Sequence, residues 1–161
     1  MLRGVIVRLA TGSGPHSGTD DPLYVGISGS AGGREFPLDV RGFDDFERRS
    51  RVTYLLGEVW EEEARIRTRT PHEARGGWND PSLFGIGFDA IDRVYLRKQS
   101  GRVAVTDDAY ELDEIEVALY ADAGRKRLFR CTNGIWLGMA YGCQVWLTEV
   151  DPASLSVSMR L

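Results

Sequence analysis

The sequence predicts a mainly all-β fold, an antiparallel sandwich or barrel built from many short strands. The stretch 17–28 illustrates this, because a turn of small and acidic residues runs into a segment in which Leu23, Val25 and Ile27 occupy every second position. A period of two is typical of a strand with one buried face. The second half of the chain contains further apolar runs separated by turn residues, the pattern expected of a sandwich or a barrel.

Length and cysteine content indicate one domain that needs no disulfide bonds to fold. A chain of 161 residues can bury enough surface on folding to form its own core. Cys131 and Cys143 have no second Cys/His pair near them, so we expect two buried, reduced thiols and no zinc site; a disulfide is the alternative if they face each other. We expect residues 1–150 to form the domain and residues 151–161 to form a C-terminal tail.

Charge and hydropathy limit the partners. The net charge is −4, and the short basic clusters at 48–51 and 125–127 are flanked by acids, so we do not expect nucleic acid as a partner. The first nine residues do not have the pattern of a signal peptide, and no apolar run approaches the length of a membrane span. These features predict a soluble, cytoplasmic protein.

The first forty residues predict three strands. Val5, Val7 and Leu9 alternate in the first strand, and the segment 23–28 forms the second. The glycine-rich residues 29–33 resemble a hairpin turn into a third short strand at 34–38, where Pro37 indicates a sheet edge.

From residue 43 the apolar spacing changes to a helical one. Hydrophobic side chains recur near every third or fourth position, so we expect an amphipathic helix in an insertion at about 45–70, within a helical or loop region at 45–82. A strand from Val52 to Leu56 is the competing interpretation, and Gly57 weakens the helix by about 1 kcal/mol relative to alanine. Glu61, Glu62 and Glu63 are then an exposed acidic face, because consecutive residues do not face one another on a helix.

The second half predicts a series of strands joined by tight turns. The apolar positions suggest strands at 91–96, 103–105, 112–119, 128–131 and 135–138, and a closing strand from Cys143 to Val150. Turn residues at 121–124 make the strands on either side a hairpin, and Asn133-Gly134 marks the next turn.

Taken together, these segments resemble the PLAT (lipoxygenase-homology) domain, of which the chain would be a divergent, stand-alone member. The most specific element is the Gly18-Thr19-Asp20 turn that follows a first strand and enters the Tyr24-Val25 strand. Phe129-Arg130-Cys131 followed by Trp136-Leu137 is the second. The resemblance covers most of residues 4–138. It implies an eight-stranded antiparallel β-sandwich of two four-stranded sheets that acts as a binding module, docks to membranes or proteins, and sometimes coordinates calcium in its end loops.

Two departures from the family pattern bear on this reading. The segment from Val52 to Pro81 is longer than the family needs, and Leu56-Gly57-Glu58-Val59 could instead be the family's Leu-Gly-x-Ile element, which would shift the later strand assignments. Where the family often has an acidic residue after its central strand, this chain has Lys98-Gln99-Ser100, which removes a calcium ligand and adds a positive charge.

A calcium site is the metal centre that the sequence suggests. Calcium takes six to eight oxygen ligands, and the turn at 19–21 supplies only part of such a shell. Residues of three loops could share it, with Asp20 and Asp45 as the central metal ligands: Thr19, Asp20, Asp21, Asp44, Asp45, Asn79 and Asp80. The alternative is that Asp20 accepts hydrogen bonds from backbone N–H groups of its own turn. Neither interpretation requires a cofactor. Calcium is the cofactor that the sequence allows.

Trp78 and Phe84 are the residues that the sequence offers as an interaction surface. Trp78 lies in a glycine-rich, polar loop, so its indole either folds back onto the sheet or stands out as an anchor for a partner.

These features favour a non-catalytic binding module that docks through its end loops. A protein partner is preferred over a lipid surface, because a net charge of −4 without a polybasic segment gives little attraction to anionic lipid. A hydrolase-like enzyme that uses a loop histidine, His16 or His72, is the alternative, although neither adjoins a recognisable nucleophile elbow. A subunit or inhibitor-like partner of a larger assembly is the third hypothesis.

Overall fold

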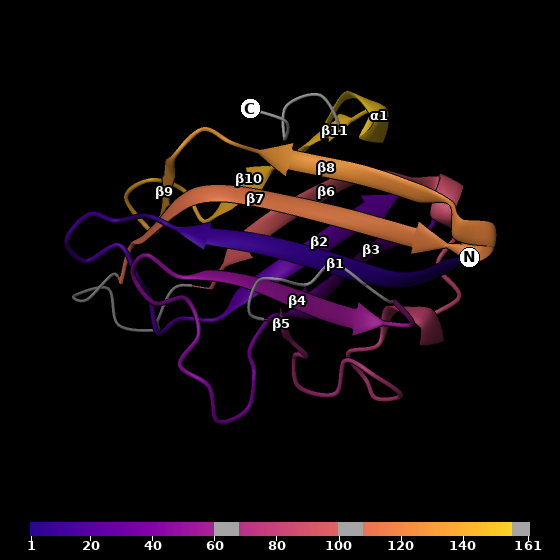
Figure 1. The fold of residues 1–161 in the computed structure, drawn as a ribbon, viewed down its shortest axis with the longest axis horizontal. Helices are drawn as coiled ribbons and strands as arrows, with labels where there is room; N and C mark the ends of the chain where they lie inside the picture. Colours follow the sequence, from indigo (N-terminus) through magenta and orange to yellow (C-terminus); the bar gives the residue numbers. More distant parts are fainter. Residues whose placement is uncertain (60–67, 100–107, 156–161) are drawn as a thin grey trace.

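Two β-sheets pack against each other in the computed structural model, which describes residues 1–59, 68–99 and 108–155 (Figure 1). The larger sheet is built from seven strands: β1 (Leu2–Thr11), β4 (Arg51–Gly57), β5 (Thr68–Arg69), β7 (Tyr110–Ala121), β8 (Lys126–Cys131), β9 (Ile135–Leu137) and β11 (Thr148–Val150). Its order is β11-β8-β7-β1-β4-β5, with β9 paired to the start of β7. The strands pair antiparallel except for the short parallel pair of β4 and β5.

The smaller sheet has four antiparallel strands and forms the second layer. These are β2 (Leu23–Gly29), β3 (Gly32–Pro37), β6 (Ile91–Lys98) and β10 (Gln144–Trp146), in the order β10-β6-β2-β3. β2 and β3 form the expected hairpin, and β3 lies at the edge, as Pro37 predicted. The antiparallel sandwich expected from the sequence is therefore confirmed, with a four-stranded sheet facing a larger one whose edges carry the short strands β5, β9 and β11.

The main core lies between the sheets. Val5, Val7 and Leu9 of β1 are buried in one cluster with Val25 of β2 and Leu96 of β6. Each such side chain stabilises the fold by roughly 1.5–3 kcal/mol relative to an exposed position. A second, smaller cluster covers part of the opposite face of the larger sheet: Ile6, Leu55, Val59, Ala118 and Leu128.

The helix expected after residue 43 is wrong for the segment 51–57, which forms β4. Here the competing interpretation was right. β4 pairs with β1 along its whole length, from Ala10 opposite Arg51 to Gly4 opposite Gly57. Every residue of β4 after Arg51 is buried, because both faces of the strand are covered. Trp60 and the acidic run 61–63 lie outside the described residues.

The predicted closing strand is divided between the two sheets. β10 pairs with β6 in the smaller sheet, whereas β11 pairs with β8 in the larger one. The chain changes sheets at Leu147, whose amide donates a hydrogen bond to the carbonyl of Val94 and whose side chain is buried in the main core. The predicted strand at 103–105 lies outside the described residues.

Short helical turns complete the described structure. They are η1 (Pro81–Leu83), η2 (Phe88–Ala90), η3 (Asp122–Gly124) and α1 (Pro152–Leu155). In the described part of the chain, no helix combines the length and the apolar character needed to span a bilayer.

Candidate metal centre and adjoining cavity

One end of the sandwich gathers the loops that carry most of the expected site residues. The last residues of β1 pair with the first residues of β4 and β7, and the start of β7 pairs with β9. The connections 12–22, 38–50 and 138–143 therefore leave the sheets at the same end. In Figure 1 this is the end towards which the arrow of β1 points.

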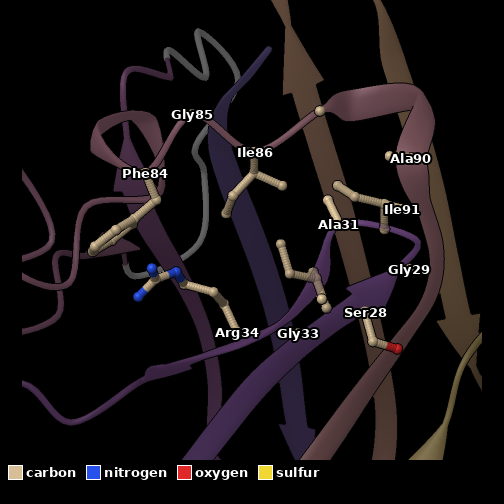
Figure 2. Close-up of a pocket in the computed structure, with 13 residues that line it drawn as sticks. Ser28, Gly29, Ala31, Gly33, Arg34, Phe84, Gly85, Ile86, Ala90 and Ile91 are labelled. Carbon is tan, nitrogen blue, oxygen red and sulfur yellow. The ribbon is translucent and has the colours of Figure 1, made fainter.

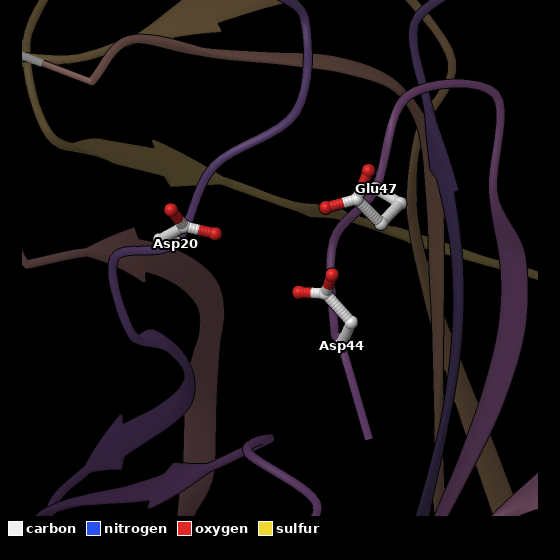
Figure 3. Close-up of side chains that lie close together, drawn as sticks. All are labelled: Asp20, Asp44 and Glu47. Carbon is white, nitrogen blue, oxygen red and sulfur yellow. The ribbon is translucent and has the colours of Figure 1, made fainter. Parts of the chain in front are cut away.

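Three carboxylates meet at this end. Asp20, from the loop before β2, lies beside Asp44 and Glu47, from the loop before β4, and one oxygen of each lies within 4.8 Å of the others (Figure 3). All three side chains are exposed. We call this group the acidic triad. Glu47 was not among the residues that the sequence suggested.

The backbone turn that carries Asp20 is held by Asp108. The Asp108 carboxylate accepts hydrogen bonds from the hydroxyl of Thr19 (2.8 Å) and from the amide of Asp20 (2.7 Å). The Thr19 hydroxyl oxygen in turn accepts the amide of Asp21 (3.0 Å). The carboxylate of Asp20 accepts no hydrogen bond from the described residues, so the alternative in which it satisfies its own turn does not describe this geometry.

Asp45 has a different environment from its neighbour Asp44. Its side chain is only 6% exposed and accepts hydrogen bonds from the Val40 amide (2.7 Å) and from the Tyr54 hydroxyl (2.9 Å). Burial raises the pKa of Asp45, and these two hydrogen bonds oppose that shift. Burial also raises the pKa of Tyr54, with the Asp45 charge as the second cause.

Asn79 and Asp80 are engaged in their own loop. Asp80 caps the turn η1 by accepting the amide (2.9 Å) and hydroxyl (2.7 Å) of Ser82, and it also accepts the Gly76 amide (2.7 Å). The Asn79 side-chain amide donates to the carbonyls of Pro37 (2.9 Å) and His72 (3.0 Å). Within the described residues, Asp20 and Asp44 are thus the two suggested calcium ligands that join a cluster, while the full ligand set remains a prediction.

A cavity of about 630 Å³ opens beside the acidic triad and shares two of its residues. Its lining combines acidic and aromatic side chains: Asp20, Asp21, Pro22, Tyr24, Glu35, Pro37, Asp39, Phe43, Asp44, Asp45, Phe46 and Trp78. We call it the acidic cavity. The cavity volume suits a small molecule rather than a bare ion.

The two residues offered as an interaction surface differ in exposure. The Trp78 side chain is 60% exposed and its ring lies edge-on to His72, so the indole does not fold back into the core. Phe84 is half-buried, contacts Phe36, and carries the guanidinium of Arg34 4.0 Å above its ring. It lines a separate cavity of about 180 Å³ at the β2–β3 hairpin (Figure 2).

The histidines and cysteines do not form a catalytic group in the described structure. His16 is exposed with a positive φ of 60°, and His72 contacts the ring of Trp78. Neither side chain forms a hydrogen bond to a serine, cysteine or carboxylate among the described residues. Cys131 and Cys143 form no disulfide with each other in the described structure, and both are half-buried, where full burial was expected.

Comparison with known proteins relates the chain to solved structures alone. No family model and no curated protein sequence matches it. Its structure is similar to the alpha-toxin of Clostridium absonum (TM-score 0.58, 20% identity), over 91% of this chain and 31% of the toxin. It is equally similar to Clostridium perfringens alpha-toxin from an avian strain (TM-score 0.58, 19% identity), over 91% of this chain and 31% of that one.

A lipoxygenase structure gives the same fold. The chain resembles coral 8R-lipoxygenase, which is described as activated by calcium via a C2-like domain, with TM-score 0.52 and 20% identity over 96% of this chain. It spans 19% of the lipoxygenase chain, so the likeness concerns one part of a larger protein. These similarities confirm a PLAT-like, C2-like β-sandwich, the fold that the sequence resemblance implied.

Proposed function

We propose that this chain is a non-catalytic docking module that binds a lipid surface through its end loops, with calcium held at the acidic triad. The observation that carries the proposal is the placement of the triad on the same end of the sandwich as exposed apolar side chains. Met139 and Tyr141, in the loop between β9 and β10, are 54% and 62% exposed. The ring of Tyr141 lies 6.1 Å from that of Trp136, so an aromatic pair forms part of this end.

The chemistry of the triad fits a calcium ion that is completed by a lipid. Asp20, Asp44 and Glu47 supply carboxylate oxygens, which are the ligands that calcium prefers. Three carboxylates leave the coordination shell open, so phosphate oxygens of a headgroup and water can occupy the rest. Calcium also offsets the net charge of −4 that otherwise opposes binding to anionic lipid.

The exposed side chains complete the docking surface. Tyrosine and tryptophan rings favour the boundary between headgroups and acyl chains, because each has an apolar body and a polar tip. The neighbouring structures support this reading, since coral 8R-lipoxygenase is described by calcium activation through a C2-like domain.

Vesicle sedimentation tests the proposal. The purified chain is expected to pellet with phosphatidylserine-containing vesicles in calcium and to stay in the supernatant with chelator. Glu47→Gln combined with Asp44→Asn is expected to abolish the calcium effect, and Asp92→Asn, an exposed carboxylate on β6, serves as the matched control. Equal pelleting with calcium and chelator, or an unchanged double variant, contradicts the proposal.

A protein partner is the second candidate, favoured by the outer face of the smaller sheet. Trp146 is 52% exposed there, contacts Tyr95, and has the guanidinium of Arg93 5.4 Å from its ring centre. Tryptophan, tyrosine and arginine are the residues enriched in interface hot spots. Mass spectrometry of proteins co-purified with the wild-type and Trp146→Ala chains tests this candidate. A partner lost only from the variant, at unchanged melting temperature, supports it.

A further inference from the structure

The acidic cavity has more negative charge than the described residues of the chain neutralise. Two of its carboxylates are ion-paired, Asp21 with Lys98 and Glu35 with Arg97. Asp20, Asp39 and Asp44 are exposed and form no ion pair within the described residues. No lysine or arginine is among the described residues that line the cavity.

Asp45 places a buried carboxylate in the same wall. It is 94% buried, since 6% of its side chain is exposed, and its two hydrogen-bond partners are neutral groups, an amide and a phenol. Buried charges in proteins are normally paired with an opposite charge or coordinate a metal. Asp45 forms no ion pair with a described residue, although the positive charge of Arg69 acts on it from a distance, and a bound cation would add to that charge.

The aromatic walls suit a cation that carries alkyl groups. Two of the rings already hold guanidinium groups of the chain, with Arg97 4.4 Å from the ring centre of Tyr24 and Arg69 4.2 Å from that of Phe43. Trp78, 60% exposed at the cavity, has no cation over its ring among the described residues. Cations placed over tryptophan faces gain the largest cation–π attraction, and aromatic cages bind quaternary ammonium groups in this way.

We infer that the acidic cavity binds an organic cation of the alkylammonium class, with its charge facing Asp39, Asp44 and Asp45 and its alkyl groups against Trp78. The volume of about 630 Å³ exceeds what one metal ion needs and matches a small organic ligand. The source is either a free ammonium compound or the choline headgroup of a lipid. The second source rests on the proposed function, whereas the first does not.

Titration calorimetry with tetramethylammonium chloride, in chelator and without vesicles, tests the site itself. Binding is expected in excess of the heat from sodium chloride at equal ionic strength. Trp78→Ala and Asp39→Asn are each expected to weaken it about fivefold or more, as the loss of one cation–π or charge contact implies. Trp146→Ala and Asp92→Asn remove an exposed tryptophan and an exposed carboxylate outside the cavity, and are expected to bind as the wild type does.

Each further outcome has a defined meaning. The inference is overturned if titration of sodium chloride releases as much heat as titration of tetramethylammonium chloride. It is also overturned if both cavity variants keep the wild-type affinity. Tighter binding of guanidinium than of tetramethylammonium overturns the alkylammonium assignment. Because Trp78 and Asp39 are exposed, both variants should keep the wild-type melting temperature, and a melting curve verifies this.

Competition experiments with two kinds of vesicle distinguish a lipid headgroup from a free ammonium compound as the source of the ligand. Phosphatidylcholine vesicles that compete with tetramethylammonium, when choline-free vesicles do not, assign the site to a lipid headgroup. Binding of tetramethylammonium without such competition assigns it to a free ammonium compound. Loss of calcium-dependent pelleting with retained tetramethylammonium binding contradicts the proposed function alone, so the two failures are separable.

Discussion

The Lys98 ammonium lies 2.7 Å from the Asp21 carboxylate, and the Lys98 side chain is fully buried. Lys98 is the last residue of β6, whereas Asp21 belongs to the turn before β2, so the ion pair ties that turn to the sheet. The sequence suggested Lys98 as a charge that disfavours calcium and Asp21 as a calcium ligand. In the structure the two neutralise each other one residue away from Asp20.

Removing the Asp21 charge should expose the cost of burying Lys98. Asp21→Asn is expected to lower the free energy of unfolding by about 2–4 kcal/mol, because the buried ammonium of Lys98 then loses its contact with the Asp21 carboxylate. Lys98→Met in the Asp21→Asn background should recover much of that loss, since it removes the buried charge. Urea unfolding of the four chains measures the cycle, and a stable Asp21→Asn chain would contradict it.

Gly57 ends β4 in a position that only glycine fits. Its φ is +76°, and a Cβ there would lie 2.5 Å from the Arg3 carbonyl oxygen. Gly57→Ala is therefore expected to destabilise the protein by about 2–4 kcal/mol, from the left-handed backbone and the clash together. Gly76→Ala is the matched control, because Gly76 has φ +70° with open space around it and should cost about 1 kcal/mol. Equal losses in thermal melts would mean that the clash has no effect.

The sequence predicted the strands with one buried face better than those with two. In β2, alternate apolar residues face the core, and the strand was predicted correctly. In β4 the residues from Val52 to Gly57 are all buried, so the periodicity that separates strand from helix is lost. Apolar residues alternate without a break from Cys143 through Leu147. The pattern therefore could not reveal that the chain passes from the smaller to the larger sheet at Leu147.

The candidate site was predicted less completely than the fold. Asp20 and Asp44 were suggested by composition, but their proximity depends on the pairing of β1 with β4, which places distant loops together. Glu47 follows Asp44 in an irregular loop that has no period to mark it. Asp108, which holds the Thr19 turn, is separated from it by most of the chain and gave no local signal.

Asp45 should give the protein a distinctive pH dependence. Its folded-state pKa is raised above the ordinary value of 3.8, chiefly by burial. The stabilisation associated with its proton is therefore complete below pH 3.8 and is lost as the pH rises through the raised pKa. Asp45→Asn is expected to lose this fall in stability, because asparagine retains an acceptor for the Val40 amide and stays neutral.

Urea unfolding between pH 4.5 and 7 measures the effect, as the difference in slope between wild type and Asp45→Asn. The carboxylates of Asp89, Asp122 and Glu149 have pKa values lowered by their arginine partners, so their contributions are lost only as the pH falls below about 4.5 and do not interfere. Parallel pH profiles for the two chains would contradict the assignment to Asp45.

Calcium and the organic cation should compete, because Asp20 and Asp44 belong both to the acidic triad and to the acidic cavity. A bound calcium ion neutralises these carboxylates, so saturating calcium is expected to weaken tetramethylammonium binding by at least about fivefold, the lower end of usual couplings between sites.

Glu47→Gln should remove the calcium effect without changing the affinity for tetramethylammonium, since Glu47 does not line the cavity. Asp39→Asn should weaken tetramethylammonium binding but leave calcium binding unchanged, since Asp39 lies outside the triad. Calorimetric titration of tetramethylammonium with and without calcium measures the coupling, which must be equal when calcium is titrated instead. Identical affinities in both conditions would show that the triad and the cavity act independently.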